Sequence, residues 1–418
     1  MKGTNNPEIR FKGFTDDWEQ RKLGDIAEKS TEKNTSLQYM ETFTNSAEFG
    51  IISQRDYFDR SISNVESLGG YYIVRPEDFV YNPRISVTAP VGPVNRNKLG
   101  KNGVMSPLYT IFRTYDIDCT YLEYFFKGNH WHSYMFFNGD SGARSDRFSI
   151  KDTVFMKMPI PLPDIREQEQ IGKFFTNLDN LITLHQRKVE RLQSIKKSML
   201  VKMFPQDDSK VPEIRFKGFA GDWEQRKLSE LCEKFTDGDW IEAKDQSDSG
   251  VRLIQTGNVG VTVYLDKPDH KKWITRETFE HLHCEEVLPG DILISRLPEP
   301  AGRACIVPYL GTKMITAVDC TIVRTSSEYS KKYLVQFLST QNYFNEVNTA
   351  LAGGTRQRIS RSNLASFDVP MPPTFEEQEE IGNYFECLDH LITLHQRKYE
   401  KLLNIKKAML EKMIGGAS

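Results

Sequence analysis

The sequence lacks the features that mark several common classes of protein. In its 418 residues no stretch approaches the roughly 18 uninterrupted apolar residues of a membrane helix, and the N-terminus MKGTNNPEIRFKGF has no apolar core of the signal-peptide kind. The six cysteines are scattered and none forms a CxxC pair, which is typical of reduced thiols rather than of a disulfide framework. We therefore expect a cytoplasmic protein with no membrane partner.

Motifs that carry catalysis or bind metals are also missing. There is no GxxxxGK[ST] phosphate loop and no strand-linked GxGxxG. The run 82–84, Asn-Pro-Arg, stops short of the Asn-Pro-Pro-aromatic run of amino-methyltransferases, and the ExK triplet at 242–244 has no suitable Asp upstream. His281, His283 and Cys284 lie close together in sequence without a fourth ligand. The sequence therefore predicts no catalytic residues, no metal site and no cofactor bound by this chain.

The charge is nearly balanced, with 55 Lys and Arg against 57 Asp and Glu, a net charge of −2. Domains that bind nucleic acids are usually basic, so this total argues mildly against such a function. A net charge does not reveal where the charges lie, however, and a balanced total can include a basic face. Nucleic-acid binding therefore stays open.

An internal duplication is the strongest signal in the chain. Residues 7–23 read PEIRFKGFTDDWEQRKL and residues 212–228 read PEIRFKGFAGDWEQRKL, so only two positions differ. The octapeptide LITLHQRK occurs at 181–188 and again at 391–398, within longer matching segments. We call these repeated parts, the two arms and the two long segments, the frame.

The stretches inside the frame behave differently. Residues 24–156 and 229–366 share little sequence that can be aligned. Drift after a recent duplication would have eroded the frame and the inserts alike. The retained frame therefore indicates that its two copies bind the same kind of partner, whereas the two inserts recognise different targets.

The long repeated segments are predicted to be helices. Each follows a proline-rich strand exit and opens with a capping box, Asp164 with Glu167 and Thr374 with Glu377. Apolar residues then recur at spacings of three and four, from Leu178 to Met203 in the first copy, without Pro or Gly. A helix from about residue 165 to 203 would be on the order of 57 Å long. We expect the two helices to pair as an antiparallel coiled coil. The expected interface residues are Leu178, Ile182, His185, Val189, Leu192, Leu388, Ile392, His395, Tyr399 and Leu402.

The inserts are predicted to be mixed domains, in which short β-type runs alternate with Gly, Pro and Asn loops. Arg suits guanine and Asn or Gln suits adenine in the major groove, so polar loop residues are candidates for reading bases. The candidates in the first domain are Asn82, Arg84, Arg96, Asn97, Lys98, Lys101, Arg144 and Arg147. The candidates in the second domain are Arg252, Gln255, Asn258, Arg296, Arg303, Arg356, Gln357 and Arg358. The alternative for each is a surface or structural role. Two loops that combine glycine with arginine, SGARSDRFSI at 141–150 and GGTRQRIS at 353–360, would then only pin the domain to the helix; we call them the glycine-arginine loops.

The expected fold class is α+β, with two mixed α/β target-recognition domains, two long antiparallel coiled-coil helices and a pseudo-twofold internal repeat. The predicted boundaries are 1–157 for the first domain with its arm, 158–206 for the central spacer helix, 207–367 for the second domain with its arm, and 368–418 for the C-terminal spacer helix.

These residues resemble the specificity subunit of type I restriction–modification systems. The resemblance covers the whole chain and rests on the FKGF…DWEQRKL arms, the PLP…REQEQI…LDNLITLHQRK segment with its second copy, and GDILISR at 290–296. It implies that each domain reads one half of a bipartite, asymmetric site in double-stranded DNA. It also implies that the helices set the gap and dock two modification subunits, which bind S-adenosylmethionine and methylate adenine. Restriction subunits, which use ATP and Mg²⁺ to translocate and cut DNA, are the other implied partners. The chain itself would be non-catalytic.

Three alternatives remain at this stage. A lone nuclease or methyltransferase with a divergent site would act on DNA without partners. A coiled-coil adaptor would bind proteins only. A solitary regulatory or decoy specificity subunit would share the fold without directing modification.

Overall fold

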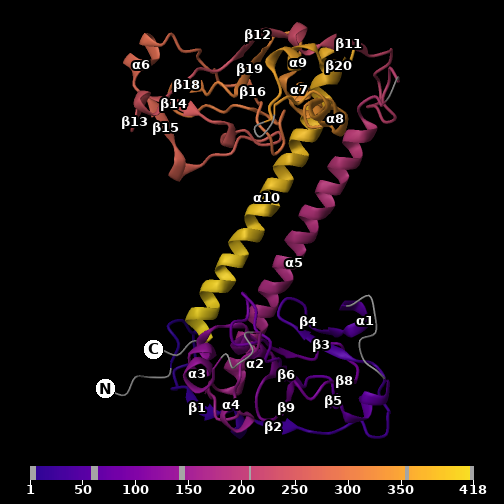
Figure 1. Ribbon diagram of the computed structural model, residues 1–418, viewed down its shortest axis with the longest axis vertical. Helices are drawn as coiled ribbons and strands as arrows, with labels where there is room; N and C mark the ends of the chain where they lie inside the picture. Colours follow the sequence, from indigo (N-terminus) through magenta and orange to yellow (C-terminus); the bar gives the residue numbers. More distant parts are fainter. Residues whose placement is uncertain (1–5, 58–64, 141–145, 207–208, 354–356, 415–418) are drawn as a thin grey trace. The chain divides into compact units, whose positions relative to one another are not determined.

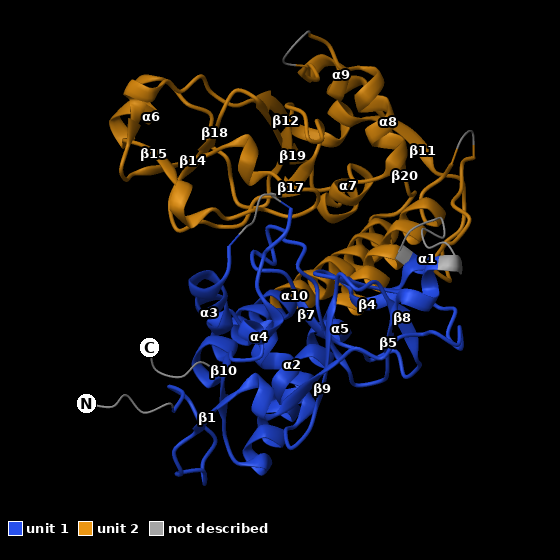
Figure 2. Ribbon diagram, turned by 60° about the horizontal axis from the view of Figure 1, so that its bottom comes forward, with its two compact units in different colours: residues 1–185, 398–418 blue, residues 186–397 orange. Residues whose placement is uncertain are grey.

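The computed structural model describes residues 6–57, 65–140, 146–206, 209–353 and 357–414. The chain forms two compact units (Figure 2): unit 1 comprises residues 1–185 and 398–418, and unit 2 comprises residues 186–397. Each long helix therefore contributes residues to both units.

Unit 1 is built on a four-stranded antiparallel sheet in the order β2-β9-β6-β7, with three two-stranded pairs, β1-β10, β3-β4 and β5-β8 (Figure 1). Its strands are β1 (Glu19–Lys22), β2 (Ala27–Ser30), β3 (Phe43–Ser46), β4 (Gly50–Ser53), β5 (Tyr72–Val74), β6 (Phe79–Tyr81), β7 (Val94–Arg96), β8 (Gly103–Met105), β9 (Thr110–Thr114) and β10 (Pro159–Leu162). Its short helices are α1 (Gln54–Tyr57), α2 (Cys119–Lys127), α3 (His130–Asn138) and α4 (Asp152–Phe155).

Aromatic side chains fill the core between this sheet and its helices. Phe79 of β6 stacks on Phe112 of β9 with ring centroids 5.5 Å apart, and Tyr81 stacks on Phe155 of α4 at 4.9 Å. Helix α2 begins where the Asp118 carboxylate accepts a hydrogen bond from the Tyr121 N–H. The aromatic-rich stretch after β9 thus forms helices because its large side chains cover the sheet.

Unit 2 has two four-stranded sheets, β12-β19-β16-β17 and β13-β15-β14-β18, and the pair β11-β20. Its strands are β11 (Glu224–Lys227), β12 (Cys232–Asp237), β13 (Gln246–Ser247), β14 (Val251–Ile254), β15 (Lys272–Ile274), β16 (Ile292–Ser295), β17 (Ala304–Ile306), β18 (Met314–Thr316), β19 (Cys320–Thr325) and β20 (Asp368–Met371). Its short helices are α6 (Arg276–His281), α7 (Lys331–Phe337), α8 (Gln341–Thr349) and α9 (Arg361–Ser366).

The two inserts share a strand order although their sequences do not align. The sheet β12-β19-β16-β17 repeats the order of β2-β9-β6-β7, and both are antiparallel. The same ion pair fastens each sheet: Arg113 Nε donates to Asp78 at 2.8 Å, and Arg324 Nε donates to Asp291 at 2.8 Å. The duplication therefore extends through the inserts at the level of topology.

Both predicted long helices are present, as α5 (Ile165–Lys202) and α10 (Phe375–Ile414). In unit 1, α5 begins at the same core in which the last residues of α10 are buried, so the two segments run in opposite directions there. No helix among the described residues is long and apolar enough to span a membrane. The predicted α+β fold, with two mixed domains and two long helices, is confirmed.

The predicted helix caps are only half correct. Thr374 Oγ1 accepts from the Glu377 N–H at 3.3 Å, and the Asp164 carboxylate accepts from the Arg166 N–H at 2.9 Å. The side chains of Glu167 and Glu377 do not complete a capping box, because each binds an arginine of the arm instead.

Candidate nucleic-acid interface

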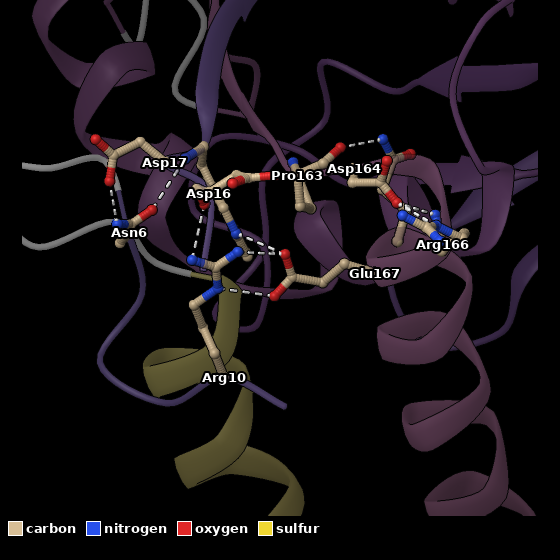
Figure 3. A network of polar contacts seen from close by, with 10 residues as sticks. Asn6, Arg10, Asp16, Asp17, Pro163, Asp164, Arg166 and Glu167 are labelled. Carbon is tan, nitrogen blue, oxygen red and sulfur yellow. Dashed lines mark hydrogen bonds and ion pairs between the residues drawn. The ribbon is translucent and has the colours of Figure 1, made fainter. Parts of the chain in front are cut away.

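The frame holds each domain to a long helix through a buried carboxylate. In unit 1, Arg10 donates from Nε to Glu167 at 2.9 Å and from a terminal nitrogen at 2.7 Å (Figure 3). Trp18 Nε1 donates to the same carboxylate at 3.1 Å. The Glu167 side chain has no exposed surface, and its hydrogen bonds raise the pKa of Arg10. We call Arg10, Trp18 and Glu167 the arm clamp.

Unit 2 repeats the arginine–glutamate part of this clamp. Arg215 donates to the two oxygens of Glu377 at 2.6 and 2.7 Å, and the Glu377 side chain is 1% exposed. Trp223 occupies the position of Trp18 in the repeat and is also buried, but its Nε1 makes no hydrogen bond with the described residues. The near identity of the two arms therefore has a structural cause, because each arm supplies the partners of a buried charge.

A second repeated contact fixes the helix that follows each sheet. Gln168 of α5 accepts from the Asp118 N–H at 2.9 Å, and Gln378 of α10 accepts from the Ser330 N–H at 2.9 Å. Asp118 and Ser330 are the N-caps of α2 and α7. The glutamine of the repeated EQ dipeptide therefore sets where the domain helix starts on the long helix.

The long helices carry a third repeated contact, one aspartate–lysine pair in each unit. In unit 1, Lys406 lies 2.6 Å from Asp179, and Tyr124 donates to the same carboxylate at 2.8 Å. In unit 2, Lys196 lies 2.5 Å from Asp389, and Gln336 donates to that carboxylate at 3.0 Å. Each pair joins the two helices and a domain helix at one point.

The predicted interface residues lie along these helices with different degrees of burial. Leu178 belongs to the core of unit 1, against which Leu402 packs, and Leu388 belongs to the core of unit 2, against which Leu192 packs. Ile182 is buried, and the other five are half-buried: His185, Val189, Ile392, His395 and Tyr399.

Three of the candidate base-reading residues in unit 1 are inside the domain. Asn82 and Asn97 are buried, and the Asn97 amide donates to the carbonyls of Arg75 and Lys101 at 2.9 and 3.1 Å. Arg96 is 9% exposed and pairs with Glu123 at 2.6 Å. A side chain held in this way cannot reach a base edge, so the structure assigns these three a role in shaping loops.

The other candidates in unit 1 remain accessible. Arg84 is exposed, and its side chain makes no hydrogen bond or ion pair with the described residues. A β-bridge joins Arg84 to Arg147, so the loop after β6 and the glycine-arginine loop lie side by side. Lys98 and Lys101 are more than half exposed and pair with carboxylates. Arg144 lies outside the described residues.

In unit 2 the buried candidates are Arg252, Asn258 and Arg296. Arg252 is 2% exposed, donates to the Lys272 carbonyl at 3.1 Å and lies over the Trp273 ring at 5.3 Å. Asn258 caps a turn by accepting from the Gln255 N–H, and Arg296 donates to the Val318 carbonyl at 2.7 Å. These side chains stabilise the domain interior rather than a DNA contact.

Arg303 also has a structural role, because its side chain stabilises the loop between β16 and β17. Its guanidinium donates to five backbone carbonyls at 2.7–3.1 Å, those of Thr256, Val259, Leu297, Pro298 and Pro300.

Gln357 and Arg358 are exposed at the glycine-arginine loop of unit 2, whereas Gln255 is half-buried. The Ile359 N–H donates to the Arg296 carbonyl at 3.1 Å, which places this loop against the loop after β16. Arg356 lies outside the described residues. In both units the glycine-arginine loop therefore lies beside a second loop that carries candidate residues, the loop after β6 in unit 1 and the loop after β16 in unit 2.

The sequence did not point to the turn between β3 and β4. The segment 44–48, from the end of β3 into this turn, lines a polar cavity of about 290 Å³ in unit 1. The loop after β6 and Tyr109 line the rest of the cavity. Nothing in the turn sequence SAEFG marks it as functional, because its position beside the β6 loop depends on the tertiary fold.

In the part of the chain that the structure describes, no group of three or more His, Cys, Asp or Glu side chains is arranged to bind a metal ion. Of the HLHC cluster, Cys284 is buried in an apolar cluster, whereas His281 and His283 are exposed.

Known proteins were compared with the chain and with its fold. The type I restriction enzyme MjaVIII specificity subunit of Methanocaldococcus jannaschii is 23% identical over 282 residues, and the match covers 64% of this chain and 64% of that protein. The match thus spans less than two thirds of the relative. Among solved structures, the type I restriction–modification S subunit from M. genitalium superposes with a TM-score of 0.61 at 13% identity, covering 99% of this chain and 100% of that one. A chain from a structure on complex assembly of the type I R-M system gives a TM-score of 0.51 at 14% identity, covering 96% and 99%. At these identities the structural likeness shows the fold alone.

A family model gives the decisive match. The model described as type I restriction modification DNA specificity domain fits residues 15–194 and fits again at 220–404. The two matches correspond to the two repeats and together cover most of the sequence. The chain belongs to the type I restriction modification DNA specificity domain family and carries two copies of that domain.

Proposed function

We propose that this chain is the sequence-reading, non-catalytic subunit of a type I restriction–modification complex. Each unit would read one half of a bipartite, asymmetric site in double-stranded DNA. The observation that carries this proposal is that one frame, with the same clamp, glutamine and aspartate contacts, occurs twice around inserts whose exposed loops differ.

The frame suits partners that are the same for both units. Two modification subunits would dock on it, bind S-adenosylmethionine and methylate adenine. Restriction subunits would add ATP- and Mg²⁺-dependent translocation and cleavage. Because such partners can contact the DNA phosphates, the net charge of −2 does not oppose DNA binding by the assembly.

The inserts suit the reading of two different half-sites. In unit 1 the loops after β6 and after α3 present Arg84 and Arg147, and in unit 2 the loop after α8 presents Gln357 and Arg358. Direct readout requires donors and acceptors on exposed loops that a rigid scaffold positions, which is the arrangement in each unit.

The test is to map N6-methyladenine by single-molecule sequencing in a host that has no adenine methylation of its own. The chain is expressed with a modification subunit of the same system, and the control omits the chain. We expect a bipartite motif that appears only when the chain is present. Co-purification of the complex without any methylated motif would reject the reading function, and failure to form a complex would reject the proposed partners.

A further inference from the structure

The polar cavity of unit 1 has two walls from different parts of the domain. One wall is the β3–β4 turn with Ser46 and Glu48, and the other is the β6–β7 loop with Arg84, Ser86 and Thr88. The cavity has a volume of about 290 Å³ and is lined in part by Arg84, which forms a β-bridge with Arg147 of the glycine-arginine loop.

Three asparagines, of which Asn45 and Asn82 are buried and Asn95 is half-buried, hold these two walls together. Asn45 donates to the Val80 carbonyl at 2.7 Å, Asn82 donates to the Asn45 carbonyl at 2.7 Å, and Asn95 donates to the Asn45 side-chain oxygen at 2.7 Å. The loop closes at Gly92, where φ is +84° and a Cβ atom would lie 2.1 Å from the Asn82 carbonyl oxygen. The walls are therefore organised before any ligand binds.

One charged group in each of the two lining segments is left for a ligand. Arg84 and Glu48 are both exposed, and neither side chain makes a hydrogen bond or ion pair with the described residues. The remaining polar groups have partners: Ser86 and Thr88 bond to each other at 3.2 Å, as do Thr44 and Tyr109. The lining thus offers a forked donor from one segment and a carboxylate acceptor from the other.

This pairing matches one base pair in the major groove. An arginine donates to guanine O6 and N7, and a carboxylate accepts from the cytosine N4 amino group. An A·T pair also presents acceptors, adenine N7 and thymine O4, and a donor, adenine N6, but on neither base does it have the two adjacent acceptors that one arginine takes bidentately on guanine.

We propose that Arg84 and Glu48 together read one G·C base pair in the half-site recognised by unit 1. The inference rests on the proposed function and adds the identity of one base pair and of two specificity-determining residues. Arg84 specifies the guanine and Glu48 the cytosine, while Asn45, Asn82 and Asn95 position the walls.

The experiment maps methylated motifs for the full chain with its modification subunit, comparing wild type with Arg84→Ala and Glu48→Ala. The matched controls are Lys157→Ala and Glu28→Ala, which change exposed charges of unit 1 outside the cavity. Exchanging residues 24–156 for those of another family member identifies which half-site unit 1 reads. Equal melting temperatures of variants and wild type establish that the variants fold.

We expect the wild-type half-site to contain a G·C pair at which both variants lose discrimination on the order of ten- to a hundredfold. All other positions and the second half-site should stay unchanged, and the controls should give the wild-type motif. A uniform loss of methylation without a change in motif would overturn the inference, since it would make Arg84 a phosphate contact. An unchanged motif, or relaxation at two different positions, would also overturn it. If the wild-type chain directs no motif, the proposed function itself fails.

Discussion

At the scale of single residues, the frame depends on charges buried in defined pairs. Glu167 has three donors from the arm, 149 to 157 residues away in sequence, and Glu377 repeats the arginine pair. Burying a carboxylate without partners costs several kcal/mol, so the arm and the helix start must form together. The coupling requires the arginine and the tryptophan of the arm, and both occur in each copy. One of the two positions at which the arms differ, Thr15 in the first and Ala220 in the second, is exposed and outside the clamp.

Loss of the clamp carboxylate should destabilise unit 1. We expect Glu167→Ala to lower the free energy of unfolding by about 3 kcal/mol, because Arg10 and the indole N–H of Trp18 lose their buried acceptor. Urea unfolding followed by tryptophan fluorescence measures the change. The control is Glu19→Ala, whose side chain is 70% exposed and whose loss should cost under about 0.5 kcal/mol. Equal midpoints for the two variants would show that the ion pair does not hold the arm.

Glu123 should make unit 1 sensitive to acid. Burial by itself raises the pKa of Glu123, but Lys127, Lys98 and Arg96 outweigh it, so the pKa lies below its usual value. A lowered carboxyl pKa contributes stability that is complete above the unfolded-state pKa and is lost as the pH falls through the folded-state pKa.

The wild-type free energy of unfolding should therefore fall more steeply than that of Glu123→Gln as the pH drops below about 5. Unfolding curves collected at a series of pH values test this, and the comparison isolates Glu123 because the other carboxyl groups are common to both chains. Parallel curves would contradict the expected role of its charge.

At the scale of elements, one contact pattern ties each domain helix to both long helices. The Asp179–Lys406 and Asp389–Lys196 pairs occupy equivalent positions in the repeats, and Tyr124 and Gln336 approach the same aspartates from α2 and α7. An antiparallel pair of helices has many possible registers if only apolar residues meet, whereas a fixed charge pair favours one register. The aspartates thus define the alignment of helix against helix within each unit.

A double-mutant cycle on Lys196 and Asp389 should reveal this coupling. The Lys196 side chain is 12% exposed and that of Asp389 25%, so we expect an interaction energy of about 1–2 kcal/mol from the two alanine variants and their combination. The cycle is measured by thermal or urea unfolding. The Lys202–Glu213 pair is the control, because it is 38% and 65% exposed and should couple by less than about 0.5 kcal/mol. Additive effects at Lys196 and Asp389 would argue against a register contact.

At the scale of the whole molecule, two domains that share the strand order of one four-stranded sheet are built into one repeated frame. Both α5 and α10 continue from one unit into the other, since the unit boundaries fall at 185/186 and 397/398. The proposed reading residues lie in loops of the inserts, and the frame contacts lie elsewhere. Target sequence and target spacing should therefore be separable properties of the chain.

Lengthening both helices should change spacing alone. Seven residues inserted at each unit boundary add about 10 Å of helix, which corresponds to roughly three base pairs. We expect methylation mapping to show a longer gap between unaltered half-sites. The same insertion in α5 only leaves the two helices unequal and should abolish methylation. Changed bases within a half-site would contradict the separation of spacing from reading.

The sequence by itself determined the architecture in outline. The repeated arms and the spacing of apolar residues predicted two mixed domains and two long helices, because repeats and helical periods can be read along the chain. Only the tertiary structure decided which polar residues face outward. Arg252, Asn97 and Arg303 were candidates on the same chemical grounds as Arg84, yet their side chains bond inside their domains. Glu167 likewise departed from its predicted cap because its partners come from a distant arm. The physical reason is that burial and hydrogen-bond partners depend on residues far away in sequence, which no local spacing specifies.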